Sequence, residues 1–218
     1  MANPSDTENI EFHGWTLRTR EPAAGSGRHI LLIHGWTGNE NSMWVFARHL
    51  PSDYWIVAPR APYATSPSGF SWRVEGGRPG ARPKLEDLNA SVESVVALLD
   101  GLTTDRGLPG SAWNVMGFSQ GAAMAAALAL RFPSRVERIA LLAGFIPAGG
   151  EKFAASVPLR GKTVFMAHGT LDELVDIRLG RDAARVLESA GARVELCEEQ
   201  VGHKVGADCV RRLNSFFL

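Results

Sequence analysis

The sequence predicts an α/β fold, a doubly wound and mostly parallel sheet with helices on both faces. Short apolar runs alternate along the chain with segments whose apolar residues recur every three or four positions. Apolar runs that polar residues do not interrupt are typical of strands buried on both faces of a parallel sheet. Strands that alternate with helices in this way imply a doubly wound sheet whose parallel strands are joined by right-handed crossovers.

Six apolar runs are expected to be the strands of this sheet. Five are almost wholly apolar, whereas the sixth is more polar and is expected near an edge. A hairpin that turns at His13-Gly14 is expected before them, within Ile10–Arg20. In chain order the six runs are His29–Ile33, Tyr54–Ala58, Ala112–Met116, Arg138–Leu142, Lys162–Ala167 and Arg193–Cys197.

Helical periodicity fills the gaps between these runs. An apolar stripe from Leu85 to Leu99 predicts one helix, with Gly101 as its C-terminal cap. Ser119–Arg131 is apolar on nearly all sides, which indicates a buried helix that ends before Pro133. Two further helices are expected, over Ile177–Ala190 and from Val205 to Phe217.

Length and charge limit the possible functions. The 218 residues suit one domain, residues 1–218, which is large enough to bury a core without covalent staples. Its 23 basic and 23 acidic residues give no net charge and form no block of one sign, so neither a nucleic acid nor a membrane surface is an expected partner. No apolar stretch approaches the ~20 residues that span a bilayer, so no membrane insertion is expected.

Two features favour a cytoplasmic location. The N-terminal residues lack the basic start and apolar run of a signal peptide. The chain has two cysteines, Cys197 and Cys209, which are expected to be reduced thiols, with a single disulfide between them as the alternative.

The segment Gly117-Phe118-Ser119-Gln120-Gly121 joins a predicted strand to a predicted helix with almost no connection. So tight a turn strains the backbone of its central residue and presents the Ser119 hydroxyl above the sheet, while the glycines let neighbouring backbone approach. An ordinary turn serine is the alternative, because this five-residue pattern arises often by chance. A nucleophilic role needs a base, an acid and donors to an oxyanion.

His203 is the expected base. It follows the last predicted strand, and on this type of sheet the functional groups gather at the carboxyl ends of strands, in the chain order serine, acid, histidine. His34 and His168 also end strands, but they precede the serine and the candidate acid respectively, so they are expected to shape their loops through hydrogen bonds.

Asp172 is the expected acid, since it comes first after the turn that follows the Lys162–Ala167 run. Asp176 is its rival, although Asp176 is also placed to cap the helix that begins at Ile177. Glu173 is expected to be solvated.

The oxyanion donors are expected to be the backbone amides of Gln120, which follows the serine, and Trp36, in the loop after the His29–Ile33 run. The segments Ala61–Lys84 and Gly144–Gly161 are long for loops inside a domain, and such loops are usually functional. Their aromatic residues Trp72 and Phe145, together with the side chain of Trp36, are the expected walls of a substrate pocket.

Four motifs resemble those of the α/β-hydrolases, and more narrowly the phospholipase/carboxylesterase family, which includes bacterial carboxylesterases and acyl-protein thioesterases. They are HGWTGN at 34–39, GFSQGAAMA at 117–125, HGTLDELV at 168–175 and GH at 202–203. The resemblance covers most of the chain from about Ile30 onward. It implies an α/β-hydrolase fold without a cap domain and a catalytic triad of Ser119, Asp172 and His203.

The resemblance implies a carboxylesterase that cleaves short- to medium-chain esters by two-step acyl transfer, without a metal or other cofactor. An acyl-protein thioesterase or lysophospholipase-like activity is the alternative, and a non-catalytic binding protein on the same fold is a remote one. Two positions depart from the family: Asp176 stands where relatives often have proline, and Trp36 where they often have a smaller apolar residue.

Overall fold

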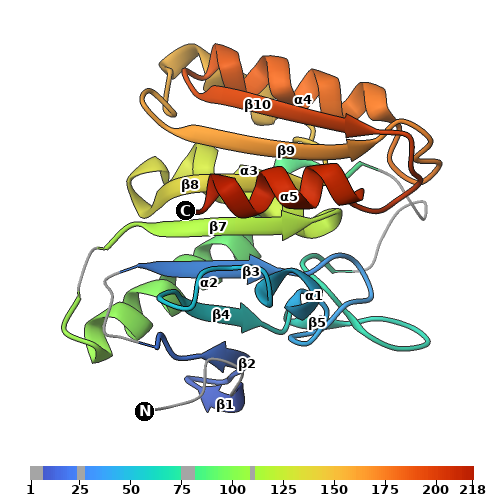
Figure 1. The fold of residues 1–218 in the computed structure, drawn as a ribbon. Helices are drawn as coiled ribbons and strands as arrows, with labels where there is room; N and C mark the ends of the chain where they lie inside the picture. Colours follow the sequence, from blue (N-terminus) through green and yellow to red (C-terminus); the bar gives the residue numbers. More distant parts are fainter. Residues whose placement is uncertain (1–6, 24–27, 75–81, 109–110) are drawn as a thin grey trace.

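The computed structural model describes residues 7–23, 28–74, 82–108 and 111–218. Its main sheet contains β1 (Glu8–Phe12), β2 (Trp15–Arg20), β3 (His29–Ile33), β4 (Trp55–Pro59), β7 (Trp113–Phe118), β8 (Val136–Leu142), β9 (Thr163–Gly169) and β10 (Arg193–Glu199). The strand order is β1-β2-β4-β3-β7-β8-β9-β10 (Figure 1). The six strands β4, β3, β7, β8, β9 and β10 run parallel to one another. At one edge, β2 pairs antiparallel with β4, and β1 pairs antiparallel with β2. The expected α/β sheet is therefore confirmed.

Helices cover both faces of the sheet. The helices α1 (Trp44–Ala47) and α5 (Ala207–Phe216) lie on one face, and α2 (Leu85–Asp105), α3 (Gln120–Arg131) and α4 (Ile177–Ser189) lie on the other (Figure 1). Alternate residues of β3 enter the two cores, with Leu31 and Ile33 facing α3 and Ile30 and Leu32 facing α1 and α5. Within the described residues, no helix is long and apolar enough to cross a membrane.

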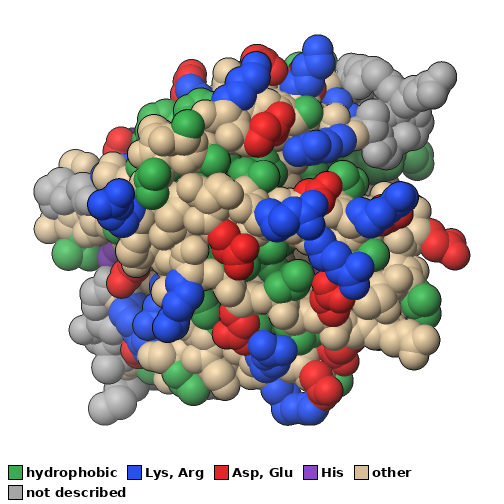
Figure 2. Space-filling view, turned by 90° about the horizontal axis from the view of Figure 1, so that it is seen from above, with side chains coloured by type: hydrophobic (Ala, Val, Ile, Leu, Met, Phe, Trp, Pro, Cys, Tyr) green, Lys and Arg blue, Asp and Glu red, His purple; other side chains and the backbone are tan. Residues whose placement is uncertain are grey.

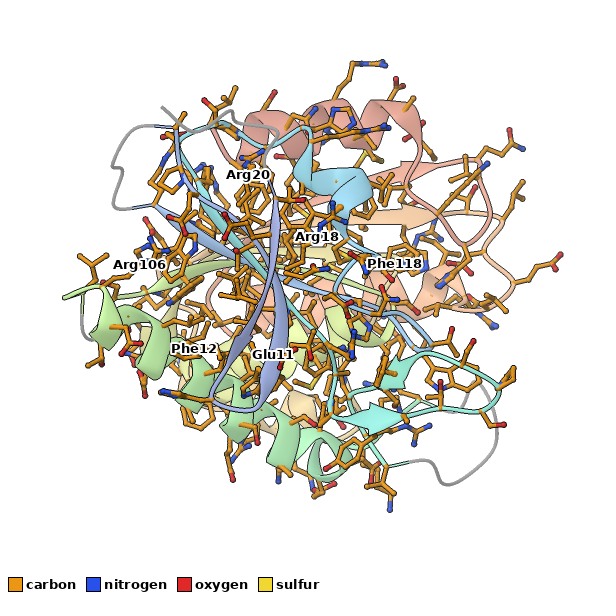
Figure 3. The ribbon with its side chains drawn as sticks, turned by 90° about the horizontal axis from the view of Figure 1, so that it is seen from below. Glu11, Phe12, Arg18, Arg20, Arg106 and Phe118 are labelled. Carbon is orange, nitrogen blue, oxygen red and sulfur yellow. A yellow bond between two sulfur atoms is a disulfide. The ribbon has the colours of Figure 1, made fainter. Side chains whose placement is uncertain are left out.

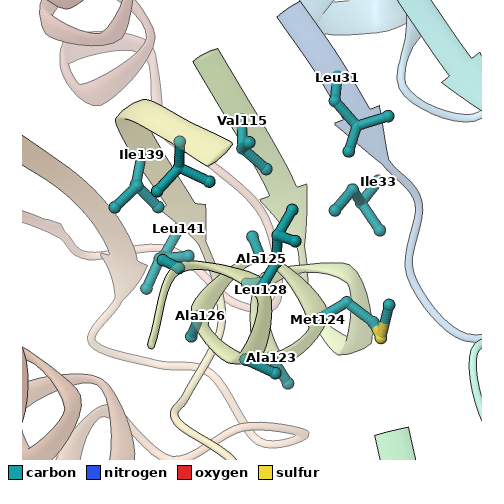
Figure 4. Close-up of a cluster of buried hydrophobic side chains, with 14 of the residues drawn as sticks. Leu31, Ile33, Val115, Ala123, Met124, Ala125, Ala126, Leu128, Ile139 and Leu141 are labelled. Carbon is teal, nitrogen blue, oxygen red and sulfur yellow. The ribbon is translucent and has the colours of Figure 1, made fainter. Parts of the chain in front are cut away.

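The helix α3 is buried along its whole length, because its alanines let it lie close to β3, β7 and β8 (Figure 4). A Cβ added to Gly144, in the loop after β8, would lie 2.2 Å from the Cβ of Ala122 in the first turn of α3. Small residues at this junction hold the N-terminus of α3 at the carboxyl edge of the sheet, where the predicted functional groups gather.

The N-terminal hairpin and the polar edge strand are confirmed. The turn between β1 and β2 places His13 at φ 47° and Gly14 at φ 83°, as a tight two-residue hairpin requires. The more polar run forms β10, which lies at the end of the sheet and, among the described strands, pairs with β9 alone. The six predicted strands differ from the observed ones by a few terminal residues.

The expected end of the first long helix is wrong. Gly101 lies inside α2, which continues to Asp105 because Leu102 and Thr103 extend its buried stripe. A glycine suits this position for a packing reason: a Cβ at Gly101 would lie 3.2 Å from the ring of Phe12, which the hairpin directs toward α2 (Figure 3).

Among the α-helices and strands of the described residues, three short ones have no counterpart among the predicted elements, nor do the 3-10 helices Pro133–Arg135 and Gly150–Ser156. The three are α1 and the strands β5 (Tyr63–Ala64) and β6 (Phe70–Ser71), which pair with each other beside the main sheet. Four or two residues are too few for an apolar period to stand out. Part of the Ala61–Lys84 segment, including Arg78, lies outside the described residues.

The expectation of reduced thiols is wrong, because Cys197 and Cys209 form a disulfide with their Cα atoms 5.7 Å apart. It joins β10 to the first turn of α5, and His203 lies in the loop that it closes. The cysteines therefore no longer support the expected cytoplasmic location. Among the described residues, the two cysteines and Glu199 are the side chains whose ligand atoms lie close enough together to hold a metal ion. The two sulfur atoms, however, are bonded to each other in the disulfide.

Removal of this disulfide is expected to destabilise the protein. Closure of a loop of this length lowers the entropy of the unfolded chain, which corresponds to about 3 kcal/mol of stability. The double variant Cys197→Ala/Cys209→Ala should unfold at a correspondingly lower urea concentration than the oxidised protein. Adding a thiol reductant should shift the urea midpoint of the wild type toward that of the variant and leave the variant itself unchanged. Equal midpoints for oxidised and reduced wild type would contradict this expectation.

Candidate active site

Ser119 occupies the turn between β7 and α3 with a strained backbone. Its φ of 55° and ψ of −116° are unusual for a residue with a side chain and cost about 1–3 kcal/mol. Its amide donates to the carbonyl of Leu142 in β8 at 2.8 Å, and its carbonyl accepts from Ala122 at 2.9 Å. Hydrogen bonds on both sides of the residue thus hold the turn in this conformation.

The two glycines that flank Ser119 are required by close backbone contacts. A Cβ at Gly117 would lie 2.1 Å from the carbonyl oxygen of Gly121. A Cβ at Gly121 would lie 2.1 Å from the carbonyl oxygen of Ile33 and 2.6 Å from that of His34. Glycine is therefore needed at both positions, because the turn packs on itself at Gly117 and α3 packs on the end of β3 at Gly121. Such close packing is expected for a serine held at a strand-to-helix turn.

The structure brings His203 and Asp172 together from the loops that follow β10 and β9. The Nδ1 atom of His203 donates to Oδ2 of Asp172 at 2.7 Å. Oδ1 of the same carboxylate accepts from the amides of Leu174 and Val175, each at 2.9 Å. The side chain of Asp172 is fully buried, so these three donors replace the water that a carboxylate would otherwise bind.

Asp176 does not take part in this arrangement. It caps α4 by accepting the amide of Arg178 at 2.8 Å, and it also pairs with the guanidinium of that residue. Hydrogen bonds from Arg178 lower the pKa of the Asp176 carboxyl to about 2. Of the two candidate acids, the structure places Asp172 against the histidine and Asp176 at the helix terminus.

His168 supports the loop that carries Asp172. Its buried ring donates from Nε2 to the carbonyl of Val175 at 2.7 Å and lies against α4, where a Cβ at Gly180 would be 2.5 Å from Nδ1. Nε2 is 3.6 Å from Oδ2 of Asp172, so the ring also forms part of the surroundings of that carboxylate.

His34 holds the loop that precedes Trp36. Its Nδ1 donates to the carbonyl of Gly35 at 2.7 Å, and its Nε2 accepts from the amide of Ala61 at 3.0 Å. Burial lowers the pKa of the His34 imidazole to about 4, so the ring is neutral at pH 7, as these two bonds require. The backbone at Gly35 lies beside the serine, because a Cβ there would be 3.4 Å from the Cβ of Ser119.

Trp72 is not a pocket wall, and this expectation is wrong. Its side chain is fully buried, and its indole N–H donates to the carbonyl of His34 at 2.8 Å. Trp72 directly follows the two-stranded β5–β6 unit and its side chain points inward. Through its hydrogen bond to His34, the side chain supports the loop that carries Trp36. A tryptophan in a loop is ambiguous in a sequence, since the same side chain can form a wall or fill a core.

The side chain of Gln120 has a role that its position after the serine did not reveal. Its Oε1 accepts from the backbone amide of Trp72 at 3.0 Å, and its Nε2 donates to Oγ of Ser71 at 3.1 Å. The side chain therefore ties α3 to β6. The backbone amide of Gln120 lies in the first turn of α3, where amides have no partner inside the helix.

Ser119 and His203 line the same cleft, whose volume is about 1650 Å³. Phe118 also lines this cleft, with its ring centroid 5.1 Å from that of His203. Trp36, with 49% of its surface exposed, and Phe145 also line the cleft, in agreement with the expected walls. The structure thus gathers the loops after β3, β8, β9 and β10 and the β7–α3 turn around one opening.

The comparisons with known proteins agree with this architecture. The family model described as phospholipase/carboxylesterase matches residues 17–217. Acyl-protein thioesterase 1 of Debaryomyces hansenii is 25% identical over 195 residues, which are 79% of this chain and 80% of the relative. A probable carboxylesterase of Oryza sativa subsp. japonica is 30% identical over 166 residues, 73% of this chain and 62% of the relative.

Among solved structures, the carboxylesterase from Mesorhizobium loti superimposes with a TM-score of 0.82. It is 21% identical to this chain, and the match covers 96% of this chain and 97% of the other. This likeness supports the fold, and the family match supports the chemistry. The chain belongs to the phospholipase/carboxylesterase family and is an ester hydrolase with the α/β-hydrolase fold.

Proposed function

We propose that this chain is a serine carboxylesterase for short- to medium-chain esters, in which Ser119 is the nucleophile, His203 the base and Asp172 the orienting acid. The observation that carries the proposal is the 2.7 Å bond from His203 to the buried Asp172, at the cleft that Ser119 lines. Asp172 can stabilise the imidazolium that forms when His203 takes the serine proton.

The proposed mechanism has two acyl-transfer steps. Ser119 attacks the ester carbonyl as His203 accepts its proton, and the amides of Trp36 and Gln120 stabilise the resulting oxyanion. His203 then protonates the leaving alcohol, which gives an acyl-enzyme. Water, deprotonated by the same histidine, attacks the acyl group and releases the acid and the free serine. Two of the loops that the mechanism uses are held by buried histidines, His34 and His168.

Thioesterase activity on acylated protein is the second candidate. The cleft volume of about 1650 Å³ exceeds the range of about 300–1,000 Å³ that is usual for small-molecule pockets. The relative from Debaryomyces hansenii is named an acyl-protein thioesterase. A cleft of this size has room for a long acyl chain or for a protein side chain beside the acyl group.

Hydrolysis rates for p-nitrophenyl esters of increasing acyl length, with an acyl-thioester of each length beside them, test the proposed function. The carboxylesterase proposal expects the highest kcat/KM with short acyl oxygen esters, of about two to six carbons. Higher kcat/KM values for long-chain thioesters would favour the second candidate. Absence of hydrolysis across the whole series would contradict both.

The variant Trp36→Ala is expected to move the optimum to longer acyl chains. The indole lines the cleft, and the backbone amide beside it remains in the variant. Each methylene that the enlarged cleft buries contributes up to ~0.8 kcal/mol, so several should shift the preference between short and long esters more than tenfold. The ratio of kcat/KM for octanoate and acetate esters measures this shift. An unchanged ratio would show that the indole points away from the acyl group.

A further inference from the structure

One part of the cleft runs between α1 and α5 and has an apolar floor. Phe46 of α1 lies 6.4 Å from Phe118, measured between ring centroids, and Phe118 lies 5.1 Å from the ring of His203. Val205 and Val210 line the cleft from the α5 side. We call this region the α1–α5 groove. It adjoins the proposed base through Phe118.

Basic side chains also line this part of the cleft. Arg48, which follows α1, and Lys204 and Arg211, on the α5 side, line the cleft and are exposed. Among the described residues that line the cleft, no aspartate or glutamate is present. The whole chain has equal numbers of acidic and basic residues, 23 of each, so this one-sided lining is not a consequence of composition.

The neighbouring carboxylate does not cancel these charges. Arg211 forms an ion pair with Asp208 one turn earlier, and both side chains are largely exposed, at 71% and 65%. Exposed ion pairs of this kind contribute little free energy, so Arg211 can exchange this partner for a bound anion. Acidic and basic side chains are otherwise interspersed over the surface seen from above (Figure 2).

The mechanism assigns the α1–α5 groove to the alcohol side of the ester. The base must reach the leaving oxygen to protonate it, so the alcohol lies next to His203. Lys204 and Val205 follow His203 directly in the chain and continue as the wall of the groove. Phe145, Leu174 and Val175 line the same cleft from the loops after β8 and β9, and they are then available to the acyl group.

We propose that the α1–α5 groove binds the alcohol part of the substrate, and that this part carries an anionic group, a carboxylate or a phosphate, on an apolar body. The proposal rests on the proposed function, because it is the ester cleavage that defines an alcohol side. Apolar surface then packs on Phe46 and Phe118, while Arg48, Lys204 and Arg211 attract the charge.

Matched acetate esters test this assignment. One pair comprises acetylated p-hydroxyphenylpropanoate and the acetylated primary amide of the same acid, whose leaving phenols differ little in basicity because two methylenes insulate the ring. Acetylated p-hydroxyphenethyl phosphate distinguishes a phosphate from a carboxylate. The mono-p-nitrophenyl ester of glutaric acid, compared with p-nitrophenyl valerate, places the charge on the acyl side instead.

We expect kcat/KM to be about tenfold higher for the anionic alcohol esters than for the neutral amide at low ionic strength. The ratio should fall toward one as salt is raised, since exposed charges are screened. The ratio should decrease about twofold for each cation removed in Arg48→Gln and Arg211→Gln, since three cations together are expected to give the tenfold preference. Arg212→Gln is the matched control, because Arg212 is the next residue on α5, pairs with Glu195 and does not line the cleft.

The outcomes separate this proposal from the proposed function. Ser119-dependent hydrolysis with equal kcat/KM for the charged and neutral acetates overturns the anionic groove and leaves the esterase intact. If kcat/KM is higher for the glutarate ester than for the valerate ester, and the acetates show no such difference, the anionic group belongs to the acyl part of the substrate. This result also overturns the proposal. If no ester is cleaved, the assignment of an alcohol side fails together with the proposed function. Calorimetric binding of p-hydroxyphenylpropanoate against its amide then tests the anion-binding groove alone: equal affinity overturns it, and weaker binding of the carboxylate in Arg48→Gln supports it.

Discussion

Replacement of Ser119 by alanine is expected to lower esterase turnover by about 10⁶, the loss seen when the nucleophile of a comparable triad is removed. The substitution deletes one hydroxyl and keeps the Cβ, so the strained turn can be retained. Turnover with a p-nitrophenyl ester measures the effect, and circular dichroism of the variant checks that the fold is intact.

Two controls make this result specific to the turn between β7 and α3. Ser42 lines the same cleft but lies in the loop before α1, so Ser42→Ala should keep most of the activity. An organophosphate probe should label Ser119 and no other serine of the wild type. Labelling at another serine, or substantial activity in Ser119→Ala, would contradict the assigned nucleophile.

Asp172→Asn is expected to lower turnover by roughly 10⁴, with a smaller effect on KM. The amide oxygen of asparagine can still accept from Leu174 and Val175, so the loop should keep its shape. The amide nitrogen then faces Nδ1 of His203 as a donor. The imidazole must accept there and carry its proton on Nε2, which leaves it unable to accept the proton of the serine.

Asp176→Asn is the matched control for this substitution. Asp176 is four residues away, and its carboxylate contacts Arg178 at the start of α4. Its loss should therefore weaken a helix cap and leave turnover almost unchanged. Turnover and thermal unfolding of both variants, measured side by side, decide between the acids. A larger loss of turnover in Asp176→Asn would contradict the choice of Asp172.

Much of the site could be predicted because each part lies shortly after a strand of the parallel sheet. Parallel strands bring their carboxyl ends to one edge of the sheet, so Ser119, Asp172 and His203 had to approach one another once the strands were recognised. The same rule located the loop of Trp36. The pairing of Asp172 rather than Asp176 with the histidine depended on the geometry of the loop, which the sequence left open between the two.

Other features depend on contacts between distant segments, which no local pattern reports. The Cys197–Cys209 disulfide requires β10 and α5 to lie side by side, and neither residue carries a signal of that distance. The side chain of Trp72 faces inward because its indole N–H donates a hydrogen bond to the carbonyl of His34. The basic lining of the cleft is likewise assembled from the segment after α1, the loop after β10 and α5, so it forms no charge block along the chain.

The central claim is that hydrolysis passes through an ester of Ser119, and an acid-quenched reaction with p-nitrophenyl acetate tests it most directly. Mass spectrometry of the quenched protein should find one acetyl group per chain during turnover, and peptide analysis should place it on Ser119. The adduct should be absent from Ser119→Ala. Turnover without any acyl adduct, or an adduct on a different residue, would contradict the mechanism.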